Sequence, residues 1–132
     1  MSQTDIAIGS LCAWRENRGG GEPGMHSVLN VLVNRAVARG TSIEQESLRP
    51  WQFSSMTAKG DPQLRLGPDC LDAADLSAYL TAVRLAAEAD AGNLPDITGG
   101  ATSYFASSMA DPPEWAASMQ FTVEIAGQRF YR

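Results

Sequence analysis

The run NRGGGEPG at residues 17–24 limits the fold more than any other feature of this chain. It holds four glycines and one proline, a density that neither a helix nor a strand tolerates. We therefore expect a loop here, with a helix on each side. A first helix is predicted from about Thr4 to Glu16, and a second from Met25 to Arg39 with Gly40 as its stop signal.

Two further helices are predicted in the middle of the chain. Thr41, with Glu44 three residues later, has the form of a capping box for a short helix that ends before Pro50. The segment 56–70 is rich in Gly, Pro and Asp and predicts a long exposed connection. Residues 72–91 predict the longest helix, closed by Gly92. Its apolar residues are expected to pack around much of its circumference: Leu76, Tyr79, Leu80, Val83, Leu85 and Ala87.

The C-terminal part predicts a β-hairpin. Phe121, Val123 and Ile125 alternate with polar residues, and Ala126-Gly127 leads into a second short strand at residues 128–131. Residues 101–106 form a short polar and aromatic stretch before it. Helices thus dominate over a small antiparallel sheet, so the predicted class is α+β. A length of 132 residues with 44% hydrophobic residues predicts one domain over 1–132.

Charge and composition exclude several classes of function. Fifteen acidic against ten basic residues give a net charge of -5, which disfavours binding to nucleic acid or to an anionic membrane. No apolar run is long enough for a membrane-spanning helix, and the first residues do not read as a secretory signal, so we expect the protein in the cytosol. Two cysteines and one histidine predict neither a metal site nor a disulfide framework. Cys12 and Cys70 are expected to be reduced, and no cofactor is expected.

Glu16 is the first candidate for chemistry. It stands at the end of an apolar helix, beside a glycine loop that lets a bulky ligand approach the backbone. Partial desolvation there favours the neutral carboxylic acid, which can donate a proton to a glycosidic oxygen. The alternative is a solvated helix-end residue paired with Arg15 or Arg18. Glu22 is a secondary candidate for a second carboxylate.

Other polar residues leave two interpretations open. His26 near a helix start is typical of a surface residue. Asn30 and Asn34 lie one helical turn apart, where amides either bind backbone carbonyls or line a polar cleft. The segments 51–54 and 104–105 interleave aromatic and hydrogen-bonding side chains, which suits a carbohydrate groove and a hydrophobic core equally well. The three consecutive glycines lack the spacing and the lysine of a phosphate-binding loop.

Four separated motifs together resemble the SleB-type cell-wall hydrolases, the family of spore-cortex-lytic enzymes and related phage lysins. The segment from Glu16 through Arg35 resembles the opening signature E-A-R-G…G-x-x-A-V-x-x-V-x-x-N-R. Residues 52–54 resemble the family's Q-F-S segment, and residues 99–105 its G-G-A-T motif. Residues 113–115 and 125–131 resemble the ending P-x-W…I-G-x-H-x-F-Y. The resemblance extends over almost the whole chain.

The resemblance implies a lysozyme-like domain that cleaves the β-1,4 bond between N-acetylmuramic acid and N-acetylglucosamine in the glycan strands of peptidoglycan. Members of the family are regarded as lytic transglycosylases, and their first Glu, here Glu16, is the catalytic acid. One carboxylate is then sufficient, because its conjugate base takes a proton from the C6 hydroxyl and closes a 1,6-anhydro ring. The groove residues that the resemblance implies are Arg18, Gln52, Ser54, Thr102 and Tyr104.

The sequence departs from the family pattern at three positions. Gly20 replaces the second acidic residue of the opening signature, Asn17 replaces its alanine, and Arg129 replaces the histidine of the last motif. With no appended wall-binding module or signal sequence, the chain fits a monomeric phage endolysin that stays in the cytosol until release and then acts on the cell wall from the host periplasm. Two alternatives remain open: a hydrolytic muramidase in which Glu22 or Asp61 holds a water, and a non-catalytic glycan-binding or virion-associated domain.

Overall fold

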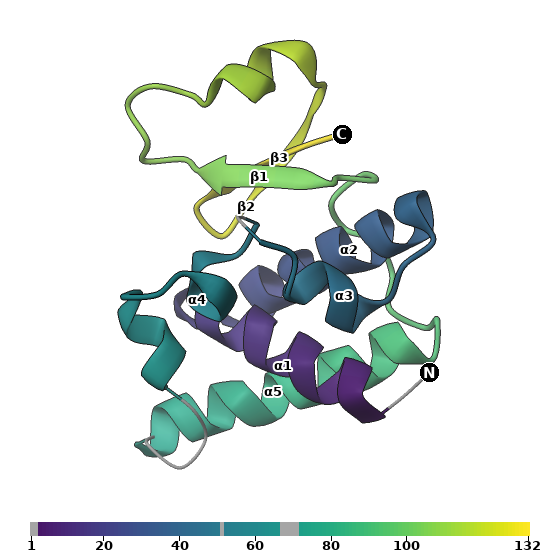
Figure 1. Cartoon of the computed structure of the whole chain (residues 1–132), viewed down its shortest axis with the longest axis vertical. Coiled ribbons are helices and arrows are strands. Elements are labelled where there is room, and N and C mark those ends of the chain that lie inside the picture. Colours follow the sequence, from purple (N-terminus) through teal and green to yellow (C-terminus); the bar gives the residue numbers. More distant parts are fainter. Residues whose placement is uncertain (1–2, 51, 67–71) are drawn as a thin grey trace.

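The α-helices form the lower part of the molecule, and a small sheet with a short helical segment above it forms the upper part in the view of Figure 1. The computed structural model describes residues 3–50, 52–66 and 72–132. Its α-helices are α1 (Gln3–Asn17), α2 (Gly21–Arg39), α3 (Ile43–Ser47), α4 (Ser54–Thr57) and α5 (Ala73–Asp90). Short 3-10 helices are η1 (Arg18–Gly20), η2 (Pro62–Arg65) and η4 (Glu114–Ser118). The strands are β1 (Ser103–Ala106), β2 (Phe121–Ile125) and β3 (Gln128–Tyr131).

The predicted loop at residues 17–24 is wrong. The chain turns through η1 and enters α2 already at Gly21, so all four glycines and the proline lie inside helical structure. The proline is tolerated because it stands in the first turn, where its missing N–H has no helical partner to lose. Two of the glycines are required by packing, since a Cβ at Gly20 or at Gly24 would lie 2.7 Å from the side chain of Asn17.

Helix α1 lies at the centre of the helical core. Its residues Cys12, Ala13 and Trp14 are completely buried, and the Trp14 indole donates a hydrogen bond to the Asp75 carbonyl in α5 at 3.1 Å. The apolar residues Met25, Val28, Leu29 and Leu32 of α2 all lie in the same core. The Cys12 thiol is free, and burial raises its pKa, which keeps it protonated. Cys70 lies outside the described residues.

Helix α5 is found where it was predicted, but it is neither the longest helix nor apolar all round. It has 18 residues against 19 in α2. Leu76 and Leu80, which were expected to pack, are 41% and 61% exposed, whereas Leu85 is buried. The helix covers only one side of α1, as Figure 1 shows, and its other side faces solvent.

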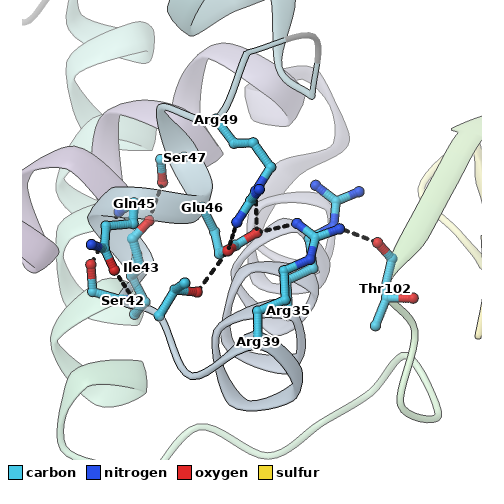
Figure 2. Close-up of polar contacts among 10 residues, drawn as sticks. Arg35, Arg39, Ser42, Ile43, Gln45, Glu46, Ser47, Arg49 and Thr102 are labelled. Carbon is cyan, nitrogen blue, oxygen red and sulfur yellow. Dashed lines mark hydrogen bonds and ion pairs between the residues drawn. The ribbon is translucent and has the colours of Figure 1, made fainter.

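The capping box of α3 lies one residue later than predicted. Ser42 accepts a hydrogen bond from the Gln45 N–H, and the Gln45 side chain accepts one from the Ser42 N–H. Thr41 instead donates to the buried carboxylate of Glu46 at 2.6 Å. Arg39 at the end of α2 and Arg49 after α3 bind the same carboxylate, at 2.7 and 3.0 Å (Figure 2). This cluster joins α3 to the end of α2.

The segment 56–70 is less exposed than predicted in its described part. Met56 belongs to α4 and to the helical core, and η2 interrupts the connection at Pro62–Arg65. Residues 67–70 of this segment lie outside the described residues. Within the described part of the chain, no helix is both long and apolar enough to cross a membrane.

The predicted hairpin is confirmed, and a third strand joins it. Strand β3 pairs with β2 on one side and with β1 on the other, both antiparallel, so the order is β1-β3-β2. Ala126 and Gly127 both have positive φ, 49° and 79°, as a two-residue hairpin turn requires. One face of the sheet packs Phe130 against Val31 of α2. The other face carries a separate small cluster of Phe105, Ala116 and Tyr131.

Candidate active site

The carboxylate of Glu16 is held where helix α1, helix α4 and strand β1 meet. Its Oε1 accepts a hydrogen bond from the Tyr104 hydroxyl at 2.8 Å, and its Oε2 accepts one from the Ser55 hydroxyl at 2.5 Å. These partners are 88 and 39 residues away along the chain. Glu16 is partly exposed. The tertiary structure therefore assembles a defined environment around this carboxylate.

Tyr104 reaches Glu16 because of its place in strand β1. Side chains alternate between the two faces of a strand, so Tyr104 points toward the helices while Phe105 points to the opposite face. The Tyr104 ring packs against Phe130, with a distance of 5.3 Å between ring centroids. Burial, followed by the negative charge of Glu16, raises the pKa of Tyr104 well above its ordinary value of 10. The phenol therefore stays neutral and remains a hydrogen-bond donor.

Ser55 reaches Glu16 from α4, and Arg15 anchors the segment around it. The Arg15 guanidinium donates to the carbonyl oxygens of Ser55 at 3.1 Å, Leu64 at 3.2 Å and Leu66 at 2.9 Å. Two neighbouring residues of α1 thus hold this segment. Arg15 binds the backbone carbonyls of the segment, and Glu16 binds the Ser55 hydroxyl. Arg15 is therefore committed to carbonyls and does not form the ion pair with Glu16 that was one of the alternatives.

Arg18, a predicted groove residue, contacts partners other than Glu16 among the described residues. Its guanidinium stacks over the Trp14 ring at 4.2 Å from the centroid and donates to the Gln63 side chain at 2.7 Å. The carboxylate of Asp75 in α5 lies 3.7 Å from its Nε. In the described part of the chain, Arg18 thus links η1 to η2 and α5.

The remaining predicted groove residues belong to the two segments that carry Ser55 and Tyr104. Gln52 and Ser54 are exposed at the start of α4. Ser54 also lines a hollow of about 550 Å³, together with Pro50, Thr57, Ala58 and Lys59. Thr102 stands two residues before Tyr104, so both side chains lie on the same side of the chain entering β1. Of the five predicted groove residues, Tyr104 alone contacts the Glu16 carboxylate among the described residues.

Ser55 is the functional candidate that the sequence reasoning missed. The Q-F-S motif drew attention to Ser54, but the next residue is the one that faces Glu16. The sequence could have indicated an inward-facing Ser55, because Phe53 and Met56 on either side of it are apolar and mark the buried side of the short helix. Ser55 is 2% exposed, which is low for a serine outside the core.

The amides of α2 hold a loop rather than line a cleft. Asn30 donates to the Pro95 carbonyl and accepts from the Ile97 N–H, at 3.1 and 2.9 Å. Asn34 donates to the Ala101 carbonyl at 2.9 Å and to Asp96 at 3.0 Å. His26 is only partly exposed, and its Nε2 donates to Pro95 at 2.7 Å. These bonds fix the loop that leads into β1, and so they support the position of Tyr104 from a distance.

The two other carboxylates considered for catalysis are engaged elsewhere. Glu22 forms an ion pair with Arg84 of α5 at 2.6 Å and is about half exposed. Asp61 caps η2 by accepting a hydrogen bond from the Gln63 N–H at 2.9 Å. This bond lowers the pKa of Asp61, with a smaller contribution from Ser54, so Asp61 stays ionised. Among the described residues, no group of three or more His, Cys, Asp or Glu side chains is arranged to hold a metal ion.

Comparison with known proteins bears on the family and the fold of this chain. No curated protein matches the sequence. The catalytic domain of the germination-specific lytic transglycosylase SleB from Bacillus anthracis has a similar structure, with a TM-score of 0.73 at 23% identity over 100% of this chain and 97% of that chain. This likeness confirms the expected lysozyme-like α+β fold. The cell wall hydrolase family model matches residues 19–131, a region that begins just after Glu16. The chain therefore belongs to the cell wall hydrolase family, and its fold is similar to that of the SleB catalytic domain.

Proposed function

We propose that this enzyme is a lytic transglycosylase that cleaves the β-1,4 bond between N-acetylmuramic acid and N-acetylglucosamine, with Glu16 as its one catalytic carboxylate. The observation that carries the proposal is the arrangement around Glu16, where the hydroxyls of Ser55 and Tyr104 hold one oxygen each at 2.5 and 2.8 Å. The similar SleB domain is itself described as a lytic transglycosylase.

The chemistry needs one group that first donates and then accepts a proton. Protonated Glu16 gives its proton to the glycosidic oxygen while the bond from that oxygen to C1 of the muramic acid breaks. The Glu16 carboxylate then takes the proton of the C6 hydroxyl of the same sugar, and the C6 oxygen bonds to C1. The products are a free hydroxyl on one fragment and a 1,6-anhydro ring on the other. No water is consumed, and Glu16 regains its proton.

Hydroxyl partners suit a residue that alternates between acid and base. A hydroxyl can donate to a carboxylate and can accept from a carboxylic acid, so Ser55 and Tyr104 can hold Glu16 in both steps. An arginine or lysine in their place would favour the carboxylate alone. Because both hydroxyls are neutral, they orient Glu16 without fixing its charge.

Glu22 and Asp61 were the residues considered for holding a hydrolytic water. The ion pair of Glu22 with Arg84 and the capping bond of Asp61 commit both carboxylates to other partners. These contacts support a mechanism without a second carboxylate. Hydrolysis remains the competing outcome of the experiment below, because its product carries a reducing end that is heavier by one water.

The test is digestion of purified peptidoglycan followed by mass spectrometry of the soluble fragments. We expect anhydro products from the wild-type enzyme and from Glu22→Gln, which makes the same isosteric change on an exposed carboxylate. Glu16→Gln should lower the rate by roughly 10²–10⁴-fold, the usual contribution of a general acid, while the protein stays folded. Reducing ends in place of anhydro ends would establish hydrolysis. Sacculus binding without any release of fragments would establish a glycan-binding domain.

The substrate contacts extend this proposal. We place the glycan strand over the exposed Gln52 and Ser54 on one side of Glu16, and over Thr102 and Tyr104 on the other. Arg18 would contact substrate only in competition with its bonds to Gln63 and Asp75. Substitution of Gln52 by alanine should therefore raise KM more than substitution of Arg18.

The biological role is proposed on the expectations from the sequence. We propose a monomeric endolysin that accumulates in the cytosol and reaches the wall when the inner membrane is breached. Bacteria that produce it should remain intact until the membrane is permeabilised and should then lose turbidity rapidly, whereas cells producing Glu16→Gln should not. Lysis without permeabilisation would contradict this role and leave the proposed chemistry untouched.

A further inference from the structure

Arg35 is a buried cation that contacts the two segments carrying the partners of Glu16. It lies on α2 and is 7% exposed. Its Nε donates to the Thr102 carbonyl at 2.5 Å, and Figure 2 shows the side chain extending from α2 to Thr102 before strand β1. Its guanidinium carbon also lies 5.2 Å from the centroid of the Phe53 ring. Arg35 thus bridges the entry to β1 and the entry to α4.

Each residue that Arg35 contacts lies the same number of residues before a hydroxyl partner of Glu16. Thr102 precedes Tyr104 by two residues, and Phe53 precedes Ser55 by two residues. Phe53 is the N-cap residue of α4, and its carbonyl accepts from the N–H groups of Met56 and Thr57. A shift of Phe53 or Thr102 therefore moves the hydroxyl that follows it.

Packing alone does not account for an arginine at this position. Burial lowers the pKa of Arg35, which shows that enclosing this cation is unfavourable. Its NH1 group is buried and has no hydrogen-bond partner in the described part of the chain. An apolar side chain of similar volume would avoid both costs. What an apolar side chain would lack is the hydrogen bond to Thr102 and the cation over Phe53.

We propose that Arg35 is a positioning residue for the cleavage reaction, setting β1 and α4 so that the hydroxyls of Tyr104 and Ser55 both reach Glu16. The inference rests on the proposed role of Glu16. Arg35 does not touch the reacting atoms and acts through these two hydroxyls. Lysine at this position would keep the positive charge but would lose the planar fork that joins Thr102 to Phe53.

The test compares Arg35→Lys with wild type on soluble glycan strands. We expect kcat to fall on the order of 10-fold with KM within about 2-fold, because misplacement of a catalytic group affects the chemical step more than binding. The stability control is Leu85→Val, a buried change on α5, a helix that carries neither Arg35 nor its two contacts, which should lower Tm while leaving kcat unchanged. The anhydro product should remain the same, so product identity tests the proposed function and the rate tests Arg35.

A double-mutant cycle separates positioning from general structural support. If Arg35 acts through the hydroxyls, Arg35→Lys should lower kcat by less than about 2-fold in a protein that already carries Ser55→Ala and Tyr104→Phe. An equal loss in both backgrounds, or unchanged kcat in Arg35→Lys alone, would overturn the proposal. Should Arg35→Lys not fold, Phe53→Leu removes the ring under the guanidinium and keeps an apolar residue. It must then show the same background-dependent loss.

Discussion

Glu46 gives a sharp test of how the helical part of this enzyme is held together. Its carboxylate is completely buried and binds Arg39 at 2.7 Å, Arg49 at 3.0 Å and the Thr41 hydroxyl at 2.6 Å (Figure 2). Glu46→Gln keeps the shape of the side chain and removes its charge. Each arginine then loses its anionic partner, and an amide replaces an acceptor-only group.

The expected loss of stability follows from the exposure of these partners. Breaking a fully buried ion pair costs about 3–5 kcal/mol. The Arg39 and Arg49 side chains are 42% and 38% exposed, so water can solvate them after the change. We therefore expect the free energy of unfolding to fall by about 2 kcal/mol near neutral pH, which corresponds to a decrease in Tm of roughly 6–10 °C for a chain of this size.

The effect should depend on pH with a definite sign. Burial opposes ionisation of Glu46, but the hydrogen bonds from Arg49 and Thr41 and the charges of Arg39 and Arg49 together bring its pKa below the ordinary value of 4.5. A carboxylate with a lowered folded-state pKa stabilises the protein above the unfolded-state value, and this contribution is lost as the pH falls through the folded-state value. The difference between wild type and Glu46→Gln should therefore be full near neutral pH and should shrink below about pH 4.5.

Chemical denaturation at neutral pH and at about pH 3.5 measures this difference. Glu44→Gln is the matched control, because it removes a charge from the same short helix and should change the stability by less than about 0.5 kcal/mol. A Glu46→Gln protein as stable as Glu44→Gln, or a loss of stability equally large at both pH values, would show that the buried charge of Glu46 does not stabilise the fold.

Two further predictions concern the active site and the glycine-rich segment. Tyr104→Phe removes one hydroxyl from Glu16 and keeps the ring in place. Because a hydrogen bond to a charged group is worth about 1.5–3 kcal/mol, kcat should fall roughly 10-fold or more, with little change in Tm. Wild-type kcat in this variant would show that the 2.8 Å bond is not used in the reaction. Gly24→Ala should lower the stability by at least about 1 kcal/mol even though alanine favours helices, because its Cβ would lie 2.7 Å from the Asn17 amide. Gly19→Ala is the control, since its Cβ would enter open space and the change should be nearly neutral. Equal thermal unfolding of the two glycine variants would contradict the packing argument.

Local sequence signals predicted those parts of the fold that depend on neighbouring residues. The alternation of Phe121, Val123 and Ile125 with polar residues sufficed for the hairpin, because side chains in a strand alternate between two environments. Gly40 marked the end of α2 and takes up a left-handed conformation there, with φ at 65°. The order of the family-like motifs pointed to Glu16 as the residue to examine, and its catalytic role stays a prediction.

Long-range contacts decided the parts that local signals missed. The glycines at residues 20 and 24 read as helix breakers, yet in the fold they make room for Asn17, whose position depends on α1. Strand β1 forms because β3 pairs with it, from Ser103 opposite Tyr131 to Ala106 opposite Gln128. The choice between Ser54 and Ser55 depends on how α4 is turned toward α1. A single sequence contains no direct record of these spatial relations.

The order of strands in the sheet has a consequence for when the enzyme becomes competent during its synthesis. Strand β3 comes last along the sequence but lies in the middle of the sheet, and β1 is held by it. The ribosome releases α1 and Glu16 early, whereas the strand that fixes Tyr104 emerges about a hundred residues later. A nascent chain that stops before residue 128 thus carries Glu16 without its phenolic partner in place, so on the proposed mechanism we expect cleavage only once the closing strand is made.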